Sequence, residues 1–185
     1  MSPLLTMQTG GRKYSEEAQV NIEKMHHVAY KCRDAEETRH FYEDILGLPL
    51  AHVIRLDRVP STGEPVPFAH LFFEMKDGSY IAFFDLGDGK SSVRDPATPE
   101  WLAHLAVEVP DRKELEEWKS RVEAHGIKVV GPTDHEFVDS IYFFDPNGIR
   151  LEITTKTVPS SVLEGYAADA HEELRLWMAR DKQTA

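Results

Sequence analysis

The sequence is poor in cysteine and has fewer basic than acidic residues. Cys32 is the only cysteine among 185 residues, which excludes an internal disulfide and a thiolate zinc cluster. The chain carries 32 Asp and Glu against 21 Lys and Arg, a formal net charge of −11 at pH 7. This balance disfavours nucleic acid as a partner, because phosphate binding requires clustered Lys and Arg.

Long apolar runs are also missing. No stretch approaches the length that a bilayer span needs, and the N-terminus lacks the basic start and long apolar region of a secretory signal. We therefore expect a cytoplasmic protein with no membrane partner. Because the chain has nine histidines and no cysteine framework, any metal site has to be built from imidazole and carboxylate groups.

The chain contains one pattern twice, after an N-terminal tail of residues 1–23. Each copy consists of a strand, an amphipathic helix and three further strands, and the copies span residues 24–86 and 100–156. Strand alternation, helical spacing of apolar residues and glycine stops support these assignments. The expected strands are 24–32, 48–56, 68–75, 79–86, 101–109, 127–131, 140–144 and 149–155, with helices at 33–47 and 111–126.

A repeat of this kind predicts the fold class. A single βαβββ unit is an open sheet with a helix on one face, and its other face needs a partner, which the second unit supplies. We predict an α+β fold in which residues 24–156 form two tandem βαβββ modules in one curved-sheet half-barrel. Residues 157–185 are expected to add a C-terminal helix. That helix can pack on the domain, pair with a second subunit or cover a site, and we favour packing.

Two histidines occupy equivalent places in the two modules. His27 and His104 each lie seven residues before the aspartate that opens the following helix, Asp34 or Asp111. A single histidine in an apolar strand is usually a satisfied core residue. Two at matched positions of a repeat are harder to explain in that way, because the pairing directs both toward one cavity.

A glutamate joins this pair when the last strands are matched through their turns. Aligning "NGIRLEI" with "DGSYIAF" places Glu152 opposite Ala82. The strand period of two puts Glu152 on the face opposite to Leu151 and Ile153. Glu152 is then either a solvated surface residue or a buried group that needs a cation. The convergence of His27 and His104 favours burial, so these three residues are the expected metal ligands, inside the half-barrel.

Two imidazoles and one carboxylate on one side of a metal, with other positions open, suit Fe(II) in oxygen chemistry. The same ligands can hold Mn(II), Co(II) or Zn(II), so the ligand set alone does not identify the metal. The open positions would let a substrate with two neighbouring oxygens and O₂ bind side by side.

This layout resembles the vicinal oxygen chelate superfamily, which includes glyoxalase I, fosfomycin-resistance proteins and type I extradiol dioxygenases. The resemblance covers about residues 24–155, and its main phrases are "FYEDILGLPL" and "YFFDPNGIRLEI". His135, Tyr142, the Asp145–Gly148 turn and Glu152 match the extradiol signature in order and spacing. Ala82 stands where glyoxalase I carries a fourth ligand, which speaks against that reaction.

The resemblance implies Fe(II) bound by His27, His104 and Glu152, with His135 and Tyr142 near the substrate oxygens. Tyr142 can equally be an ordinary core residue. The usual acid/base histidine is missing, since its place falls at Ser79 or Tyr80, so His70 on the neighbouring strand is a candidate substitute.

The sequence thus predicts an Fe(II)-dependent extradiol-type dioxygenase that cleaves a catechol-like substrate with O₂, acting as a homodimer. Its substrate pocket would be lined by Phe72, Phe83, Phe143 and the loop 58–68. The alternatives are a metal-dependent isomerase, lyase or transferase of the glyoxalase type and a metal-free small-molecule-binding resistance protein.

Overall fold

The computed structural model describes residues 22–92 and 97–179. The chain divides into two compact units, Lys24–Thr157 and a second unit made of the two terminal segments, Met1–Glu23 and Val158–Ala185. Nearly all of the predicted N-terminal tail lies outside the described residues. Within the terminal unit, α3 (Ser160–Ala179) forms the C-terminal helix that the sequence predicts.

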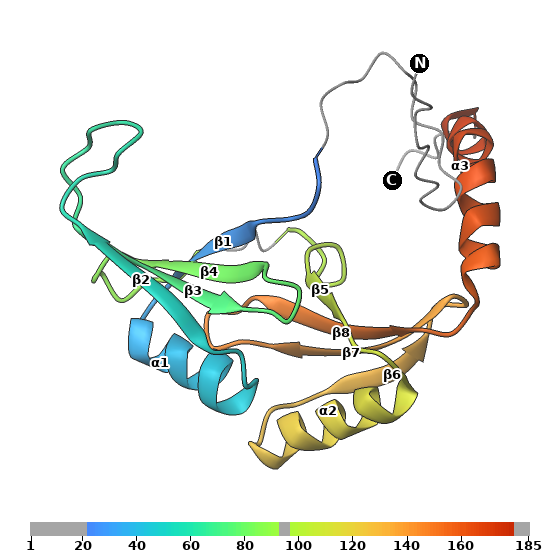
Figure 1. The fold of residues 1–185 in the computed structure, drawn as a ribbon, viewed down its shortest axis with the longest axis horizontal. Helices are drawn as coiled ribbons and strands as arrows, with labels where there is room; N and C mark the ends of the chain where they lie inside the picture. The colour runs from blue at the N-terminus through green and yellow to red at the C-terminus, as the bar shows by residue number, and fades with distance from the viewer. Residues whose placement is uncertain (1–21, 93–96, 180–185) are drawn as a thin grey trace, which may run out of the picture. The chain divides into compact units, whose positions relative to one another are not determined.

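The Lys24–Thr157 unit confirms the tandem βαβββ order (Figure 1). The first module contains β1 (His27–Cys32), α1 (Ala35–Arg39), η1 (His40–Ile45), β2 (Leu50–Leu56), β3 (Phe68–Glu74) and β4 (Tyr80–Asp85). The second module contains β5 (Leu105–Glu108), α2 (Arg112–Ala124), β6 (Val130–Asp134), β7 (Val138–Phe144) and β8 (Arg150–Lys156). Several strand bounds differ from the prediction: β1 and β6 begin three residues later and β5 begins four residues later than expected, whereas β7 begins two residues earlier.

Each module builds its own four-stranded mixed sheet, with strand orders β1-β4-β3-β2 and β5-β8-β7-β6. The first strand of a module pairs in parallel with its last strand, and the other pairs are antiparallel. The described strands thus give an α+β fold of two open sheets with no closed barrel. Helices α1 and α2 lie on the same side of these sheets (Figure 1).

The first helix is shorter and less regular than expected. Asp34 caps it as predicted, because its side chain accepts a hydrogen bond of 2.7 Å from the Glu37 amide. The Glu37 carboxylate pairs with Arg33 instead of completing a capping box. The remainder of the predicted helix forms η1, a wider π-helical turn, and the chain leaves it through Gly47 at a φ of 70°.

One hydrophobic core joins both modules on the helical side of the sheets. Alternate residues of β3, β4, β7 and β8 enter it, together with the buried residues of η1 and α2, and the partly buried Ala35 of α1 packs against it. Phe83 and Phe143 belong to this core at 0% and 2% exposure, and Phe143 also borders a cavity of about 280 Å³ on the helical side of the sheets. Strand alternation therefore leaves the opposite side of each sheet free for a site.

The turn between β7 and β8 fastens the two modules together. The Asp145 carboxylate is buried and accepts hydrogen bonds from the Tyr42 hydroxyl at 3.1 Å and from the amides of Asn147 and Ile149. The Asn147 side chain accepts from the Arg33 amide at 3.0 Å. The "DPNG" phrase is therefore a structural joint between the second module and the first helix.

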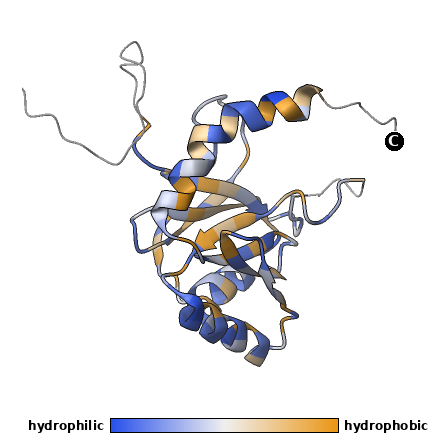
Figure 2. Cartoon of the chain, turned by 90° about the vertical axis from the view of Figure 1, so that its right-hand side faces the viewer, coloured by the Kyte–Doolittle hydropathy of each residue, from blue (hydrophilic) through white to orange (hydrophobic). Residues whose placement is uncertain are grey.

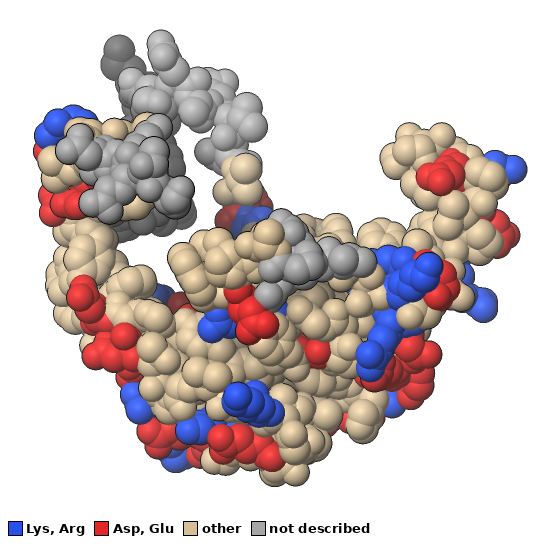
Figure 3. All heavy atoms as spheres, turned by 180° about the vertical axis from the view of Figure 1, so that it is seen from behind, with Lys and Arg blue, Asp and Glu red and all other residues tan. Residues whose placement is uncertain are grey.

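The solvent-facing sides of the helices are mostly polar, as expected for amphipathic helices. Hydrophilic residues dominate the outer side of α2 in Figure 2. On the face that Figure 3 shows, Lys and Arg lie interspersed with Asp and Glu. None of the helices that the structure describes combines the length and apolar character of a membrane span.

Candidate metal and substrate site

The strand register confirms the sequence match between the two modules. Ala29 of β1 pairs with Ala82 of β4, and Ala106 of β5 pairs with Glu152 of β8. Ala29 and Ala106 each follow a predicted histidine ligand by two residues. Glu152 and Ala82 therefore occupy equivalent positions, and only the second module has a carboxylate there.

His104 and Glu152 meet on the open side of the second sheet. The His104 Nε2 atom lies 2.9 Å from the Glu152 Oε2 atom. Glu152 is 7% exposed, whereas His104 is partly accessible at the start of β5. The structure thus brings together two of the three predicted metal ligands.

Both ring nitrogens of His104 have a partner. Its Nδ1 atom lies 3.2 Å from the carbonyl oxygen of Trp101, and a carbonyl can only accept, so Nδ1 carries the proton. The other ring nitrogen, Nε2, faces an oxygen of the Glu152 carboxylate, which is an acceptor. A proton on Nε2 makes this contact an imidazolium–carboxylate ion pair, and a metal ion can take the place of that proton.

The separation of these two atoms also fits a metal. Two ligand atoms that each lie about 2.1 Å from one ion, at a right angle, are about 3 Å apart. The observed 2.9 Å is compatible with that spacing, and it is also the distance of a direct N–H···O hydrogen bond. The donor set of one imidazole and one carboxylate suits a divalent cation such as Fe(II), Mn(II), Co(II) or Zn(II).

Ser140 orients the glutamate and was not identified from the sequence. Its Oγ atom donates to Glu152 Oε1 at 2.5 Å, from the adjacent strand β7, and Ser140 is fully buried. The other carboxylate oxygen is left facing His104. The signal that could have revealed Ser140 is its position two residues before Tyr142, on the same face of β7.

Tyr142 and His135 form a second polar pair beside the first. The Tyr142 hydroxyl lies 2.7 Å from His135 Nε2, and Tyr142 pairs directly with Glu152 across β7 and β8. The ring centroids of Tyr142 and His104 are 6.1 Å apart. His135 lies in the loop after β6, which is closed by a backbone hydrogen bond of 2.9 Å between His135 and Val138.

The surroundings of Tyr142 keep it neutral. Burial raises the pKa of its hydroxyl, and the Glu152 carboxylate raises that pKa further, while Ser140 and Arg150 act in the opposite direction. The Arg150 guanidinium lies 4.2 Å from the centre of the Tyr142 ring, at the distance of a cation–π contact. A positive group therefore borders the hydroxyl and carboxylate of the site.

The other predicted ligand, His27, lies on the first sheet. It contacts His26, His70 and Phe72, all within the first module. Among residues 22–92 and 97–179, no three His, Cys, Asp or Glu side chains are grouped to hold a metal ion. Within one chain, His104 and Glu152 therefore lie together on the second sheet, and His27 lies on the first sheet.

The three residues considered for the role of the missing acid/base histidine, Ser79, Tyr80 and His70, all lie in the first module. Ser79 is a turn residue, since its hydroxyl donates to Asp77 at 2.6 Å and its side chain is buried. Tyr80 lies opposite His27 in the sheet. His70 is buried on β3, with its ring centroid 5.9 Å from that of His27.

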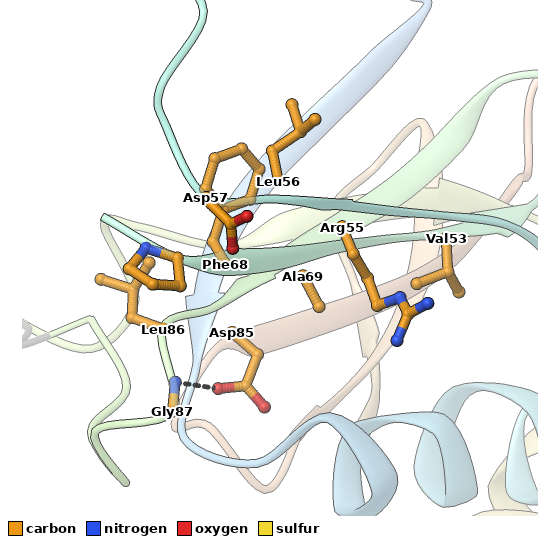
Figure 4. Close-up of a pocket in the computed structure, with 10 residues that line it drawn as sticks. Val53, Arg55, Leu56, Asp57, Phe68, Ala69, Asp85, Leu86 and Gly87 are labelled. Carbon is orange, nitrogen blue, oxygen red and sulfur yellow. Dashed lines mark hydrogen bonds between the residues drawn. The ribbon is translucent and has the colours of Figure 1, made fainter. Parts of the chain in front are cut away.

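A broad depression on the helical side of the first sheet is a weaker candidate. Figure 4 shows Arg55 and Asp85 among its lining residues. The Asp85 carboxylate already accepts hydrogen bonds from the amides of Ala35, at 2.9 Å, and Gly87, at 2.7 Å. This carboxylate serves the local backbone, so the depression offers no comparable chemistry.

Comparisons with known proteins place the chain in a family. Residues 24–153 match the model of the Glyoxalase/Bleomycin resistance protein/Dioxygenase superfamily. MhqA of Bacillus subtilis (strain 168), a protein provisionally assigned as a ring-cleaving dioxygenase, is 25% identical over 138 residues, which cover 73% of this chain and 41% of that protein. The chain therefore spans less than half the length of this relative.

Solved structures share the fold. A glyoxalase/dioxygenase from Nostoc punctiforme superposes with a TM-score of 0.56 at 26% identity, covering 80% of this chain and 100% of that chain. A fosfomycin resistance protein from Listeria monocytogenes, complexed with Mn(II) and dihydroxypropylphosphonic acid, gives a TM-score of 0.54 at 18% identity, covering 77% and 99%. With its repeated βαβββ modules and the family match over both, this chain belongs to the glyoxalase/bleomycin resistance protein/dioxygenase superfamily.

Proposed function

We propose that this protein is a metal-dependent dioxygenase that cleaves the ring of a catechol-like or hydroquinone-like substrate with O₂. The observation that carries the proposal is the close approach of His104 Nε2 and Glu152 Oε2, 2.9 Å apart, which places one imidazole and one carboxylate where a single cation can bind both. The neighbouring Tyr142–His135 pair and the similarity to MhqA support ring cleavage in preference to other reactions of the superfamily.

His104 and Glu152 would hold the metal, with His27 as the third ligand. Fe(II) is the preferred ion, because it supplies coordination positions at which substrate oxygens and O₂ are brought together and activated. Mn(II), Co(II) and Zn(II) remain compatible with the same ligands.

We further propose that His27 comes from a second copy of the chain. Within one chain His27 is exposed on the open side of the first sheet, and its contacts all stay in that module. The open side of the second sheet presents His104 and Glu152. Pairing the first module of one copy with the second module of another would assemble all three ligands and make the homodimer the active form.

The remaining residues handle protons and charge. Tyr142, kept neutral by burial, donates a hydrogen bond to a developing negative oxygen on the substrate. His135 holds the Tyr142 hydroxyl at 2.7 Å and fixes its direction. Arg150 offers a positive charge to a phenolate or carboxylate, which matters because the chain as a whole carries a net charge of −11.

The test is anaerobic reconstitution of the full chain with Fe(II), followed by oxygen-uptake measurements with catechols, hydroquinones and hydroxylated aromatic acids. We expect one or more of these substrates to consume oxygen in a metal-dependent manner. The His104→Ala variant should lose both bound metal and oxygen uptake. Oxygen uptake that persists in this variant would contradict the proposal.

The alternative is an isomerase, lyase or transferase that uses the same ligands with Mn(II) or Zn(II). The His104–Glu152 contact does not distinguish these reactions, since it would hold either ion. Stoichiometric metal without oxygen uptake would favour this alternative. Protein purified without a metal-affinity tag and found free of metal would instead favour a small-molecule-binding role.

A further inference from the structure

The hairpin that joins β6 to β7 turns sharply directly after His135. Glu136 has a φ of 70°, and it is the one residue other than glycine with a positive φ in the part of the chain that the structure describes. The Phe137 amide donates to the His135 carbonyl at 2.9 Å, a hydrogen bond that encloses Glu136 in a γ-turn. A γ-turn with a positive φ at its centre is rare and strained when that residue carries a side chain.

Neighbouring groups hold both the amide and the carbonyl of Glu136. The Asp134 Oδ1 atom accepts from the Glu136 amide at 2.7 Å. From the end of β8, the Thr157 hydroxyl donates to the Glu136 carbonyl at 3.2 Å. Backbone strain of this kind persists only where the surrounding structure enforces it, and such places concentrate at functional sites.

Thr157 connects this turn to the strand that carries Glu152. Its amide also donates to the Phe137 carbonyl, at 3.0 Å. Because β8 ends at Lys156, Thr157 directly continues that strand. Strand β7 lies between β8 and β6 in the sheet, so the turn and the candidate metal ligand belong to one hydrogen-bonded frame (Figure 1).

The direction of the His135 ring depends on the turn. His135 is exposed, so packing does little to fix its side chain. Its Nε2 atom nevertheless lies 2.7 Å from the Tyr142 hydroxyl. The rotamers open to a side chain depend on its own backbone, and the backbone of His135 takes part in the γ-turn through its carbonyl.

We propose that Thr157 is a positioning residue of the candidate site, which holds the strained γ-turn at Glu136 and thereby directs His135 onto the Tyr142 hydroxyl. The inference rests on the proposed ring cleavage for its relevance to a reaction. The Tyr142–His135 hydrogen bond itself needs no metal, substrate or O₂, so the positioning role can be tested separately.

The hydroxyl of Thr157 is the group that distinguishes this role from ordinary strand pairing. The amide hydrogen bond to Phe137 extends the pairing of β7 with β8, and any residue except proline would supply it. Only threonine or serine can add the second hydrogen bond, to the Glu136 carbonyl. The decisive variants therefore change the hydroxyl and keep the amide.

The test is NMR of the full, metal-free chain, in which the side-chain ¹⁵N signals of His135 are followed. Tyr142→Phe gives the reference for a His135 ring without its partner. Thr157→Val should move the Nε2 signal about half of the way toward that reference, or further, because the turn loses one of its hydrogen bonds. Thr157→Ser keeps the hydroxyl and should restore the wild-type signal. An unmoved signal in correctly folded Thr157→Val would overturn the proposal.

The matched control is Thr62→Val, because the Thr62 hydroxyl accepts a hydrogen bond of 3.3 Å from the Glu64 amide in the loop between β2 and β3. This variant should leave the His135 signal unchanged, and a shift as large as in Thr157→Val would overturn the proposal.

Two variants of Glu136 separate its backbone from its side chain. Glu136→Gln should keep the His135 signal, since the turn uses only backbone groups of this residue. Glu136→Pro cannot adopt a φ of 70° and should shift the signal toward the Tyr142→Phe reference. A shift in Glu136→Gln that equals the one in Thr157→Val would contradict a role for the turn.

Oxygen uptake after reconstitution with Fe(II) relates the positioning to the proposed reaction. Thr157→Val should lower kcat about three- to tenfold with little change in KM or metal content, and Thr157→Ser should recover the activity. A shifted His135 signal with unchanged kcat would overturn the role in catalysis. Absence of oxygen uptake by the wild type would count against ring cleavage alone, because the NMR comparison uses no metal.

Discussion

The Ser140 hydroxyl donates to one oxygen of the Glu152 carboxylate, 2.5 Å away, and thereby leaves the other oxygen to His104. A carboxylate held in this way needs no rearrangement before it binds a cation. Hydrogen bonds of this kind to ligand residues typically contribute a factor of 10 to 100 in metal affinity.

Ser140→Ala should therefore weaken divalent metal binding by about 10- to 100-fold without unfolding the protein. Competitive metal titration against a chelator measures this directly. Ser120→Ala is the control, because Ser120 lies on α2 and donates to the backbone of Glu116. Unchanged metal affinity in Ser140→Ala would show that the Ser140 hydrogen bond does not prepare Glu152 for metal binding.

Mixing two inactive variants tests whether the site is shared between copies. His27→Ala and His104→Ala should each be inactive alone. If His27 acts on the second module of another copy, a mixed dimer contains one site with both histidines. A 1:1 mixture after subunit exchange should then recover about a quarter of the wild-type activity and bound metal. If the mixture stays inactive while size-exclusion and mass measurements show that mixed dimers form, all three ligands come from one chain.

Tyr142→Phe removes the hydroxyl that is proposed to stabilise a developing oxyanion. The expected loss is about 10²- to 10³-fold in kcat, with little change in metal content. Tyr30→Phe is the control, since Tyr30 packs against the core. The double variant with His135→Ala should be hardly worse than Tyr142→Phe, because the two side chains act as one hydrogen-bonded unit. Fully additive losses would contradict that coupling.

The pKa of His70 predicts how stability depends on pH. The pKa falls from 6.5 in the unfolded chain to about 4 in the folded protein, so the folded state binds fewer protons between these values. The free energy of unfolding should decrease as the pH is lowered from 6.5 to 4, by up to about 3 kcal/mol from this residue. Urea unfolding of His70→Leu should show a correspondingly weaker decrease over this range. Identical pH profiles for the variant and the wild type would mean that His70 is charged or exposed in solution.

The joint between the modules predicts a large effect on stability. Asp145→Ala removes the acceptor of hydrogen bonds from Tyr42, Asn147 and Ile149 and leaves buried donors unpaired. We expect a loss of about 2–4 kcal/mol in the free energy of unfolding. Asp57→Ala, at an exposed loop position, should change it by less than about 0.5 kcal/mol. Similar stability of the two variants would show that the joint contributes little.

Local patterns in the sequence were sufficient for the fold. Strand alternation and the repeated helix signals located the elements, and matching the turns paired Glu152 with Ala82, as the register confirms. The prediction was weakest where local preference competes with packing. The π-helical turn of η1 and the late start of β6 are not encoded in periodicity.

The site was only partly predictable for a different reason. His104, Glu152, Tyr142 and His135 come together because adjacent strands of one sheet place them there, and strand period reveals that. Where His27 lies relative to them depends on how whole modules associate, which no local pattern specifies. Ser140 was not predicted, because a serine in an apolar strand gives no sign of a polar role until its hydrogen-bond partner is known.

Glu152 and Ala82 occupy matched positions, so only one of the duplicated halves has a carboxylate at this place. Ala82 is fully buried and contributes no donor atom, so one half of the repeat has kept its architecture without an acid. A glutamate introduced at residue 82 would restore chemical symmetry to the pair. That single side chain offers an entry point for engineering new reactivity into a scaffold whose strand pairing already accepts it in the other half.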